Sequence, residues 1–274
     1  QRQMCIRDRI GGKLVRIGAS TACLYPMETE KAVATLIENG FRIIEIFFNS
    51  FSELELEYLE KLNEYILKNN CEVVSIHPFL SGMEPFLFFS NYGRRFYDTV
   101  DFYEKFYRGA QILGAKKLIL HGGVFPDRYN LSDEEYCKRF DIIAKRGRKF
   151  GVETLHENVN KFRASSPDFI KTMRKIIPDS AKFTLDLKQA VRSGYSPFEI
   201  LDSMGNSLKH IHINDHTNGK DCLLPFYGDF NYKEFFSECR KISYDGDVII
   251  EIYKNNFDDV TELMRSAEKL SKLL

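Results

Sequence analysis

Carboxylates and imidazoles stand at the ends of several apolar runs that have the composition of β-strands. Glu157 lies in VETLHEN, Asp186 in KFTLDL, His212 in LKHIHIND and Glu251 in DVIIEIY. These side chains are common ligands of divalent cations, and a barrel collects such groups at the carboxyl ends of its strands. The pattern therefore predicts a metal site.

The alternation of side chains along a strand decides which of these groups can meet inside a barrel. By parity, the last inward positions of four consecutive strands are Glu157, Asp186, His212 and Glu251, whereas His156 faces outward. Three carboxylates and one imidazole suit one divalent ion: Mn²⁺, Mg²⁺, Co²⁺ or Zn²⁺. The alternative, four unrelated polar caps, is disfavoured because three carboxylates without a cation repel one another.

The elements that must position these groups alternate regularly along the chain. Strands are expected at residues 14–20, 41–48, 71–79, 116–123, 152–158, 182–187, 208–215 and 247–253. Segments with helical periodicity separate most of them, and Ser132 and Ser166 are expected to be N-caps. Because parallel strands need helical crossovers, the pattern predicts an α/β fold, the (β/α)8 TIM barrel. A doubly wound sheet is disfavoured because IGASTACLYP, after the first strand, contains no GxGxxG.

Length and composition narrow the class of protein. The chain has 274 residues, 43% of them hydrophobic, which favours one domain; we expect it to span 14–274, with 1–13 a disordered or non-native leader. Basic and acidic residues number 39 each, so nucleic acid is an unfavoured partner. The six cysteines form no CxxC pair, and no apolar run reaches the roughly 20 residues of a membrane span. A cytoplasmic protein without a membrane partner is predicted.

Taken in series, the motifs LHEN, LDLKQA, HIHIND and IIEIY resemble the xylose isomerase-like sugar phosphate isomerase/epimerase family. That family shares a barrel superfamily with endonuclease IV-type nucleases, and the resemblance covers most of the chain from about residue 14. It implies one divalent ion held by Glu157, Asp186, His212 and Glu251. It also implies that Glu157 and Glu251 move a proton on a small sugar, polyol or sugar phosphate, through an enediolate.

Some positions depart from particular branches of this family. Gln189 stands where the family often has a histidine; glutamine can bond a substrate hydroxyl but cannot relay a proton. NDHTNGK lacks the arginine that ketose epimerases place there. His77 and His121 occupy two positions of the nuclease branch's three-zinc cluster, but Gln189 and the absence of Asp-x-His from KDCLLPF remove other ligands of that cluster.

Several residues near the predicted metal ligands are expected to bind the substrate, and alternative functions stay open. Predicted substrate contacts are His77, His121, Gln189, Lys188 and Asn214. His156 and His210 are expected to be structural. The alternatives are an inosose-type dehydratase, a non-catalytic carbohydrate-binding barrel and an abasic-site endonuclease; the presence of both glutamates favours catalysis.

An aromatic segment, residues 80–99, follows the third strand. One interpretation is a lid whose Phe86, Phe88, Phe89 and Tyr92 pack on a sugar. The alternative is a buried loop or an interface between subunits, so a homo-oligomer is left open.

Overall fold

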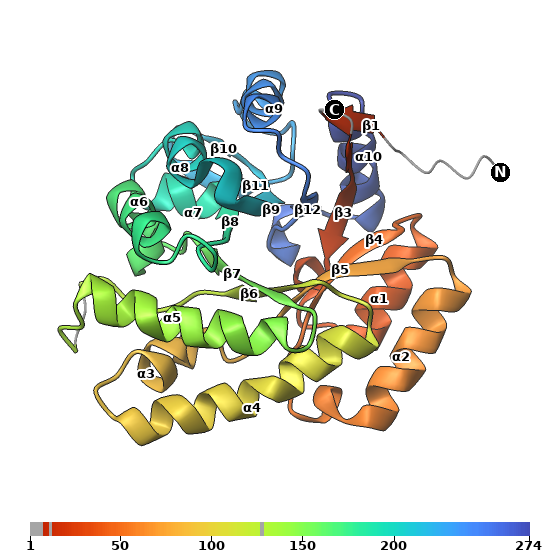
Figure 1. Cartoon of the computed structure of the whole chain (residues 1–274). Coiled ribbons are helices and arrows are strands. Elements are labelled where there is room, and N and C mark those ends of the chain that lie inside the picture. Colours follow the sequence, from red (N-terminus) through yellow and green to blue (C-terminus); the bar gives the residue numbers. More distant parts are fainter. Residues whose placement is uncertain (1–7, 11–12, 127–128) are drawn as a thin grey trace.

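A closed barrel of eight parallel strands forms the centre of the computed structural model, which describes residues 8–10, 13–126 and 129–274 (Figure 1). In order around the barrel, the strands are β3 (Ile17–Ser20), β4 (Ile43–Phe47), β5 (Glu72–His77), β6 (Lys117–Leu120), β7 (Glu153–Glu157), β8 (Phe183–Asp186), β9 (Leu208–Ile213) and β12 (Asp247–Ile250). Strand β12 closes the barrel against β3. The predicted (β/α)8 TIM barrel is confirmed.

Helices cover the outside of this barrel (Figure 1). They are α1 (Thr29–Glu38), α2 (Leu56–Lys68), α4 (Gly93–Ile112), α5 (Asp133–Arg148), α6 (Pro167–Ile176), α8 (Pro197–Met204), α9 (Tyr232–Lys241) and α10 (Val260–Ser271). The side chains of Ser132 and Ser166 accept hydrogen bonds from the first turns of α5 and α6, which confirms both N-caps.

Several shorter elements lie in the loops at the carboxyl ends of the strands, the end called the mouth below. They are α3 (Glu84–Phe88), α7 (Leu187–Arg192) and the antiparallel pair β10 (Asp215–Thr217) and β11 (Lys220–Leu223). The sequence analysis predicted none of these, nor α8, because segments so short show little periodicity.

The first two described strands lie outside the barrel. Strands β1 (Asp8–Ile10) and β2 (Lys13–Val15) pair with each other antiparallel and form a separate sheet. The prediction of a leader at 1–13 otherwise lies outside the described residues.

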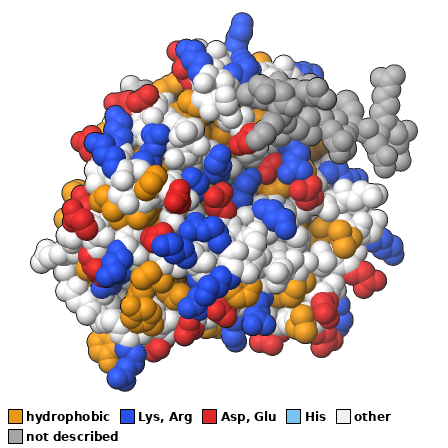
Figure 2. All heavy atoms as spheres, in the orientation of Figure 1, with side chains coloured by type: hydrophobic (Ala, Val, Ile, Leu, Met, Phe, Trp, Pro, Cys, Tyr) orange, Lys and Arg blue, Asp and Glu red, His pale blue; other side chains and the backbone are white. Residues whose placement is uncertain are grey.

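Apolar side chains fill the space between the barrel and the helices. In β9, Ile211 and Ile213 are buried in this layer, while His210 and His212 take the opposite face of the strand. The five cysteines in the described residues are free and buried. No helix among the described residues is long and apolar enough to cross a bilayer. On the surface in Figure 2, acidic and basic side chains are interspersed, in line with the balanced charge.

Ion pairs fill the end of the barrel opposite the mouth. Asp247, at the start of β12, accepts a 2.7 Å bond from Lys117 of β6 and a 2.8 Å bond from Arg16. Arg16 also bonds Glu72 at the start of β5, at 2.6 Å. Because β6 and β12 lie on opposite sides of the barrel, these contacts tie the two sides together. Carboxylates and cations are matched here.

Gly18 in β3 tests how tightly the barrel closes. A β-carbon there would lie 2.3 Å from the carbonyl oxygen of Ile43 and 2.8 Å from Cδ1 of Ile249. Gly18→Ala is therefore expected to lower the free energy of unfolding by about 1–3 kcal/mol, as overpacking does. Chemical denaturation measures this loss, with Gly93→Ala as the control because its added methyl group meets open space. Equal stability of the two variants would contradict the tight closure.

Candidate metal and substrate site

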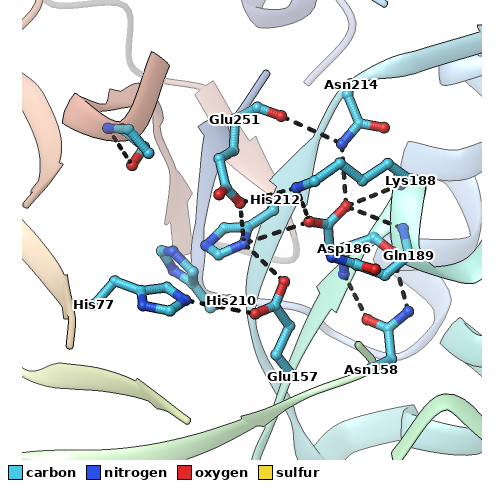
Figure 3. Close-up of polar contacts among 12 residues, drawn as sticks. His77, Glu157, Asn158, Asp186, Lys188, Gln189, His210, His212, Asn214 and Glu251 are labelled. Carbon is cyan, nitrogen blue, oxygen red and sulfur yellow. Dashed lines mark hydrogen bonds and ion pairs between the residues drawn. The ribbon is translucent and has the colours of Figure 1, made fainter. Parts of the chain in front are cut away.

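The four predicted ligands lie together at the mouth, from the ends of β7, β8, β9 and β12 (Figure 3). One donor atom from each lies within 4.8 Å of the others. Nδ1 of His212 is 2.7 Å from Oε2 of Glu251, 3.5 Å from Oε1 of Glu157 and 3.8 Å from Oδ2 of Asp186. The strand register places Asp186 directly beside His212. Their role as metal ligands stays a prediction.

Glu45 of β4 belongs to this site, and the sequence analysis missed it. Its Oε2 lies 3.1 Å from Nε2 of His210, 3.1 Å from Nε2 of His212 and 2.7 Å from Oγ of Ser75. Burial raises the pKa of Glu45, but the two imidazoles outweigh burial and hold it well below the usual value. The available signal was a single carboxylate inside the apolar run FRIIEIFF.

The contact with Glu45 fixes which nitrogen of His212 faces the carboxylates. An ionised carboxylate can only accept hydrogen bonds. Nε2 of His212 therefore carries a hydrogen and donates a hydrogen bond to Glu45. In the neutral imidazole, Nδ1 then presents a lone pair to Glu157, Asp186 and Glu251. A carboxylate that orients a histidine in this way is the usual outer partner of a metal-bound imidazole.

The donor atoms at this point fit a divalent cation. Oε2 of Glu157 and Nδ1 of His212 are buried and make no hydrogen bond of normal geometry, although His121 lies 3.1 Å from the first atom and Glu251 2.7 Å from the second. A lone pair 2.7 Å from a carboxylate oxygen needs a proton or a cation between them. Burial lowers the pKa of His212, but Glu45 and Glu251 outweigh burial and raise it well above the usual value, so the position attracts positive charge. One imidazole nitrogen with carboxylate oxygens suits Mn²⁺, Mg²⁺, Co²⁺ or Zn²⁺.

Lys188 lies inside the carboxylate cluster, at the start of α7. Its Nζ bonds Oδ2 of Asp186 and lies 3.3 Å from Oε2 of Glu251 (Figure 3). Burial lowers the pKa of Lys188, but Asp186 and Glu251 outweigh burial and raise it well above the usual value. The ammonium points at the protein's own carboxylates, and the predicted contact of Lys188 with a substrate stays a prediction.

Asparagine side chains hold Asp186 in place. Asn158 accepts a 2.7 Å bond from the Asp186 backbone N–H and donates a 3.0 Å bond to its carbonyl oxygen. Asn214, a predicted substrate contact, donates to Oδ1 of Asp186 at 3.1 Å. Gln189, another predicted substrate contact, uses its side-chain oxygen to accept the backbone N–H of Asn160 at 3.1 Å. Both predicted contacts therefore lie beside Asp186.

His77 and His121 flank Glu157 on its other side. Their Nε2 atoms lie 3.0 Å apart, and Oε2 of Glu157 is 3.1 Å from Nε2 of His121 and 3.7 Å from that of His77. The side chain of His121 is 19% exposed and that of Glu251 is 15% exposed, against 2% for Glu157. Solvent therefore reaches the cluster beside His121 and Glu251, where a substrate would enter.

Glu84 of α3 fixes the backbone next to His121 and was also missed. Its Oε2 accepts the backbone N–H groups of His121 and Gly122 at 2.7 and 2.8 Å, and its Oε1 accepts the hydroxyl of Tyr103 at 3.0 Å. The carboxylate is fully buried, which raises its pKa. Nothing in the sequence pattern distinguished Glu84 from a surface carboxylate.

In the aromatic segment 80–99, two of the rings that the lid interpretation placed on a sugar are buried. Phe88 and Phe89 are buried, and Phe89 stacks on Tyr136 with ring centroids 4.1 Å apart. Neither ring can pack on a substrate, because both belong to the apolar layer outside the barrel. Phe86 and Tyr92 are exposed.

His156 and His210 have the structural surroundings that were expected. Nε2 of His156 is 2.8 Å from the Tyr136 hydroxyl, and its ring stacks on Phe140 at 5.1 Å, so it faces α5. His210 lies deeper in the barrel than His212 and contacts Glu45 and Ser75.

Comparison with known proteins places the chain in a family. The xylose isomerase-like TIM barrel family matches residues 33–273, and the chain belongs to that family. A protein of Methanocaldococcus jannaschii is 22% identical over 95% of this chain and 89% of its own length. An inosose dehydratase of Lacticaseibacillus casei is 23% identical, over 48% of this chain and 52% of its own length.

The fold is also similar to solved structures. The crystal structure of a D-tagatose 3-epimerase-like protein superposes with a TM-score of 0.75 and 21% identity, over 94% of this chain and 97% of the other. At that identity the likeness shows the barrel fold, and the chemistry must be argued from the side chains.

Substitution of two histidines tests the assignment of strand faces. His212→Ala is expected to weaken Mn²⁺ binding by more than about 100-fold, because loss of an outer partner alone costs about 10–100-fold. His156→Ala should lower thermal stability and leave the affinity unchanged, since its ring packs on α5. Isothermal titration of both variants measures the affinities. Equal losses would show that the histidines do not divide between the two faces in this way.

Proposed function

We propose that this protein is a divalent-metal-dependent isomerase or epimerase of a small sugar, polyol or sugar phosphate. Glu157, Asp186, His212 and Glu251 hold one ion, and Glu157 and Glu251 move the proton. The observation that carries the proposal is the buried Nδ1 of His212, which Glu45 turns toward three carboxylates.

A bound divalent ion would polarise the carbonyl and hydroxyl oxygens of the substrate and acidify the adjacent C–H. Glu157 and Glu251 come from β7 and from the end of β12, so their carboxylates reach the substrate from different strands. One removes the proton from carbon and gives an enediolate; the other returns a proton to carbon. The face of the carbon to which the proton returns would decide the outcome. Return to the opposite face would give an epimer, and return to the same face would give only exchange with solvent.

Neighbouring side chains would orient the substrate. His77 and His121 offer ring nitrogens beside Glu157, at the side where solvent reaches the cluster. On the opposite side, Asn214 offers an amide group beside Asp186, and the side-chain amide of Gln189 lies beside Asn160. Hydroxyl groups of a polyol are suitable partners for such donors and acceptors.

The family and the similar structures support a sugar substrate. A dehydratase is the second candidate, because an inosose dehydratase matches about half of the chain. The same proton abstraction would start a dehydration, which would then expel a hydroxyl group instead of returning the proton to carbon. A non-catalytic sugar-binding barrel and an abasic-site endonuclease are further alternatives.

A screen in D₂O separates these functions. The Mn²⁺-loaded protein is incubated with ketoses, inososes and sugar phosphates, and NMR follows each C–H signal. Loss of a C–H signal with a new stereoisomer or positional isomer supports the proposal, whereas an unsaturated product indicates the dehydratase. Binding without exchange indicates a carbohydrate-binding barrel, and incision of abasic DNA in a parallel assay indicates a nuclease.

Amide substitutions test the proton-transfer roles. Glu157→Gln and Glu251→Gln are each expected to lower turnover by about 10²–10⁴-fold, and further if the ion is lost, because an amide cannot accept the proton. Metal content is measured beside solvent-deuterium exchange. Glu53→Gln is the control, since Glu53 is also a buried carboxylate but bonds Thr29 and Asn49 outside the site.

One result would remove a glutamate from the mechanism. A variant that keeps its ion and exchanges the substrate C–H at the wild-type rate has lost a ligand group only, and the two-glutamate scheme would have to be abandoned.

A further inference from the structure

The carboxylate of Asp186 has one oxygen available for a cation. Its Oδ1 accepts three N–H groups: the backbone of Lys188 at 2.9 Å, the backbone of Gln189 at 3.4 Å and the side chain of Asn214 at 3.1 Å. Oδ2 is the oxygen that faces Nδ1 of His212. A metal ion beside His212 must therefore use Oδ2.

Lys188 contacts that same oxygen. Its Nζ bonds Oδ2 of Asp186 and lies 3.3 Å from Oε2 of Glu251, the oxygen that is 2.7 Å from Nδ1 of His212. Two of the carboxylate oxygens that a cation beside His212 would use thus have the ammonium as a neighbour. Lys188 is 3% exposed, so water contributes little to the solvation of this charge.

We propose that Lys188 is an exchangeable internal cation of the metal site. In the metal-free protein its ammonium neutralises Asp186 and Glu251; a divalent ion takes the same two oxygens and displaces the ammonium. The inference rests on the proposed metal site and adds a residue that competes with the ion for its ligands.

Charge repulsion is the reason for displacement. An ammonium and a divalent ion on the same oxygens would lie a few ångströms apart in a buried site, where like charges repel strongly. The side chain can move without a change of fold, because Lys188 is the second residue of α7 and carries a flexible four-carbon stem. Its backbone N–H bond to Oδ1 of Asp186 can persist while Nζ leaves.

Metal titration of a charge-free variant tests the exchange. Lys188→Met keeps the length of the side chain and removes the competing charge. We expect metal-free Lys188→Met to bind Mn²⁺ roughly tenfold more tightly than wild type, within the usual range for coupled sites. Its metal-free form should also melt at a lower temperature, because the carboxylates lose their counter-charge. Lys220→Met is the control, since Lys220 is exposed on β11.

Each outcome of the titration decides the matter. Equal or weaker Mn²⁺ binding by Lys188→Met would overturn the exchange while leaving the metal site in place. Failure of both the wild type and the variant to bind Mn²⁺ would remove the proposed metal site and the exchange together.

Amine labelling of the wild-type protein provides a second test that does not depend on the variant folding. Lys188 should react slowly with acetic anhydride in the metal-free protein, because Nζ is buried and paired. Saturating Mn²⁺ should increase its acetylation relative to Lys220, measured by mass spectrometry of the peptides. Unchanged or reduced labelling on addition of Mn²⁺ would overturn the exchange.

Discussion

Three carboxylates surround a single imidazole nitrogen at the mouth of the barrel, and much of the nearby structure holds them there. A hydrogen bond to Glu45 fixes the ring of His212, and hydrogen bonds with Asn158 and Asn214 fix Asp186. Without these partners the carboxylates would separate or take up protons to relieve their repulsion. The site is therefore held in an arrangement that a cation stabilises.

The two ends of the barrel differ in how their charges are balanced. At the end opposite the mouth, Asp247 and Glu72 form ion pairs with Arg16 and Lys117. At the mouth, Glu45, Glu157, Asp186 and Glu251 have one lysine among them, Lys188, together with imidazoles. The carboxylates at the end opposite the mouth are therefore neutralised by the protein's own cations, whereas the mouth carries an excess of negative charge. This difference is the reason for proposing the metal site at the mouth.

Much of this could be predicted from the sequence, for a physical reason. Strand parity is a local property, so the inward positions of Glu157, Asp186 and His212 follow from the letters of each strand. The contacts of Glu45 could not be assigned in this way, because the two histidines that it bonds lie on β9, more than 160 residues later in the chain.

The direction in which the Lys188 side chain points could not be predicted from the sequence either. It follows β8 in a short helix, where parity no longer applies and a flexible side chain can point either way. For Phe88 and Phe89 the sequence left both a lid and a buried loop open, because the exposure of an aromatic segment cannot be judged before its neighbours, such as Tyr136, are known.

The central claim is that one divalent ion lies between Glu157, Asp186, His212 and Glu251. Anomalous diffraction from crystals of the Mn²⁺-reconstituted protein tests it most directly, because the signal locates the ion without assumptions about activity. The account predicts one strong peak within bonding distance of Nδ1 of His212 and of oxygens from the three carboxylates. A difference map without a peak there, or with its only peak between His77 and His121, would contradict it.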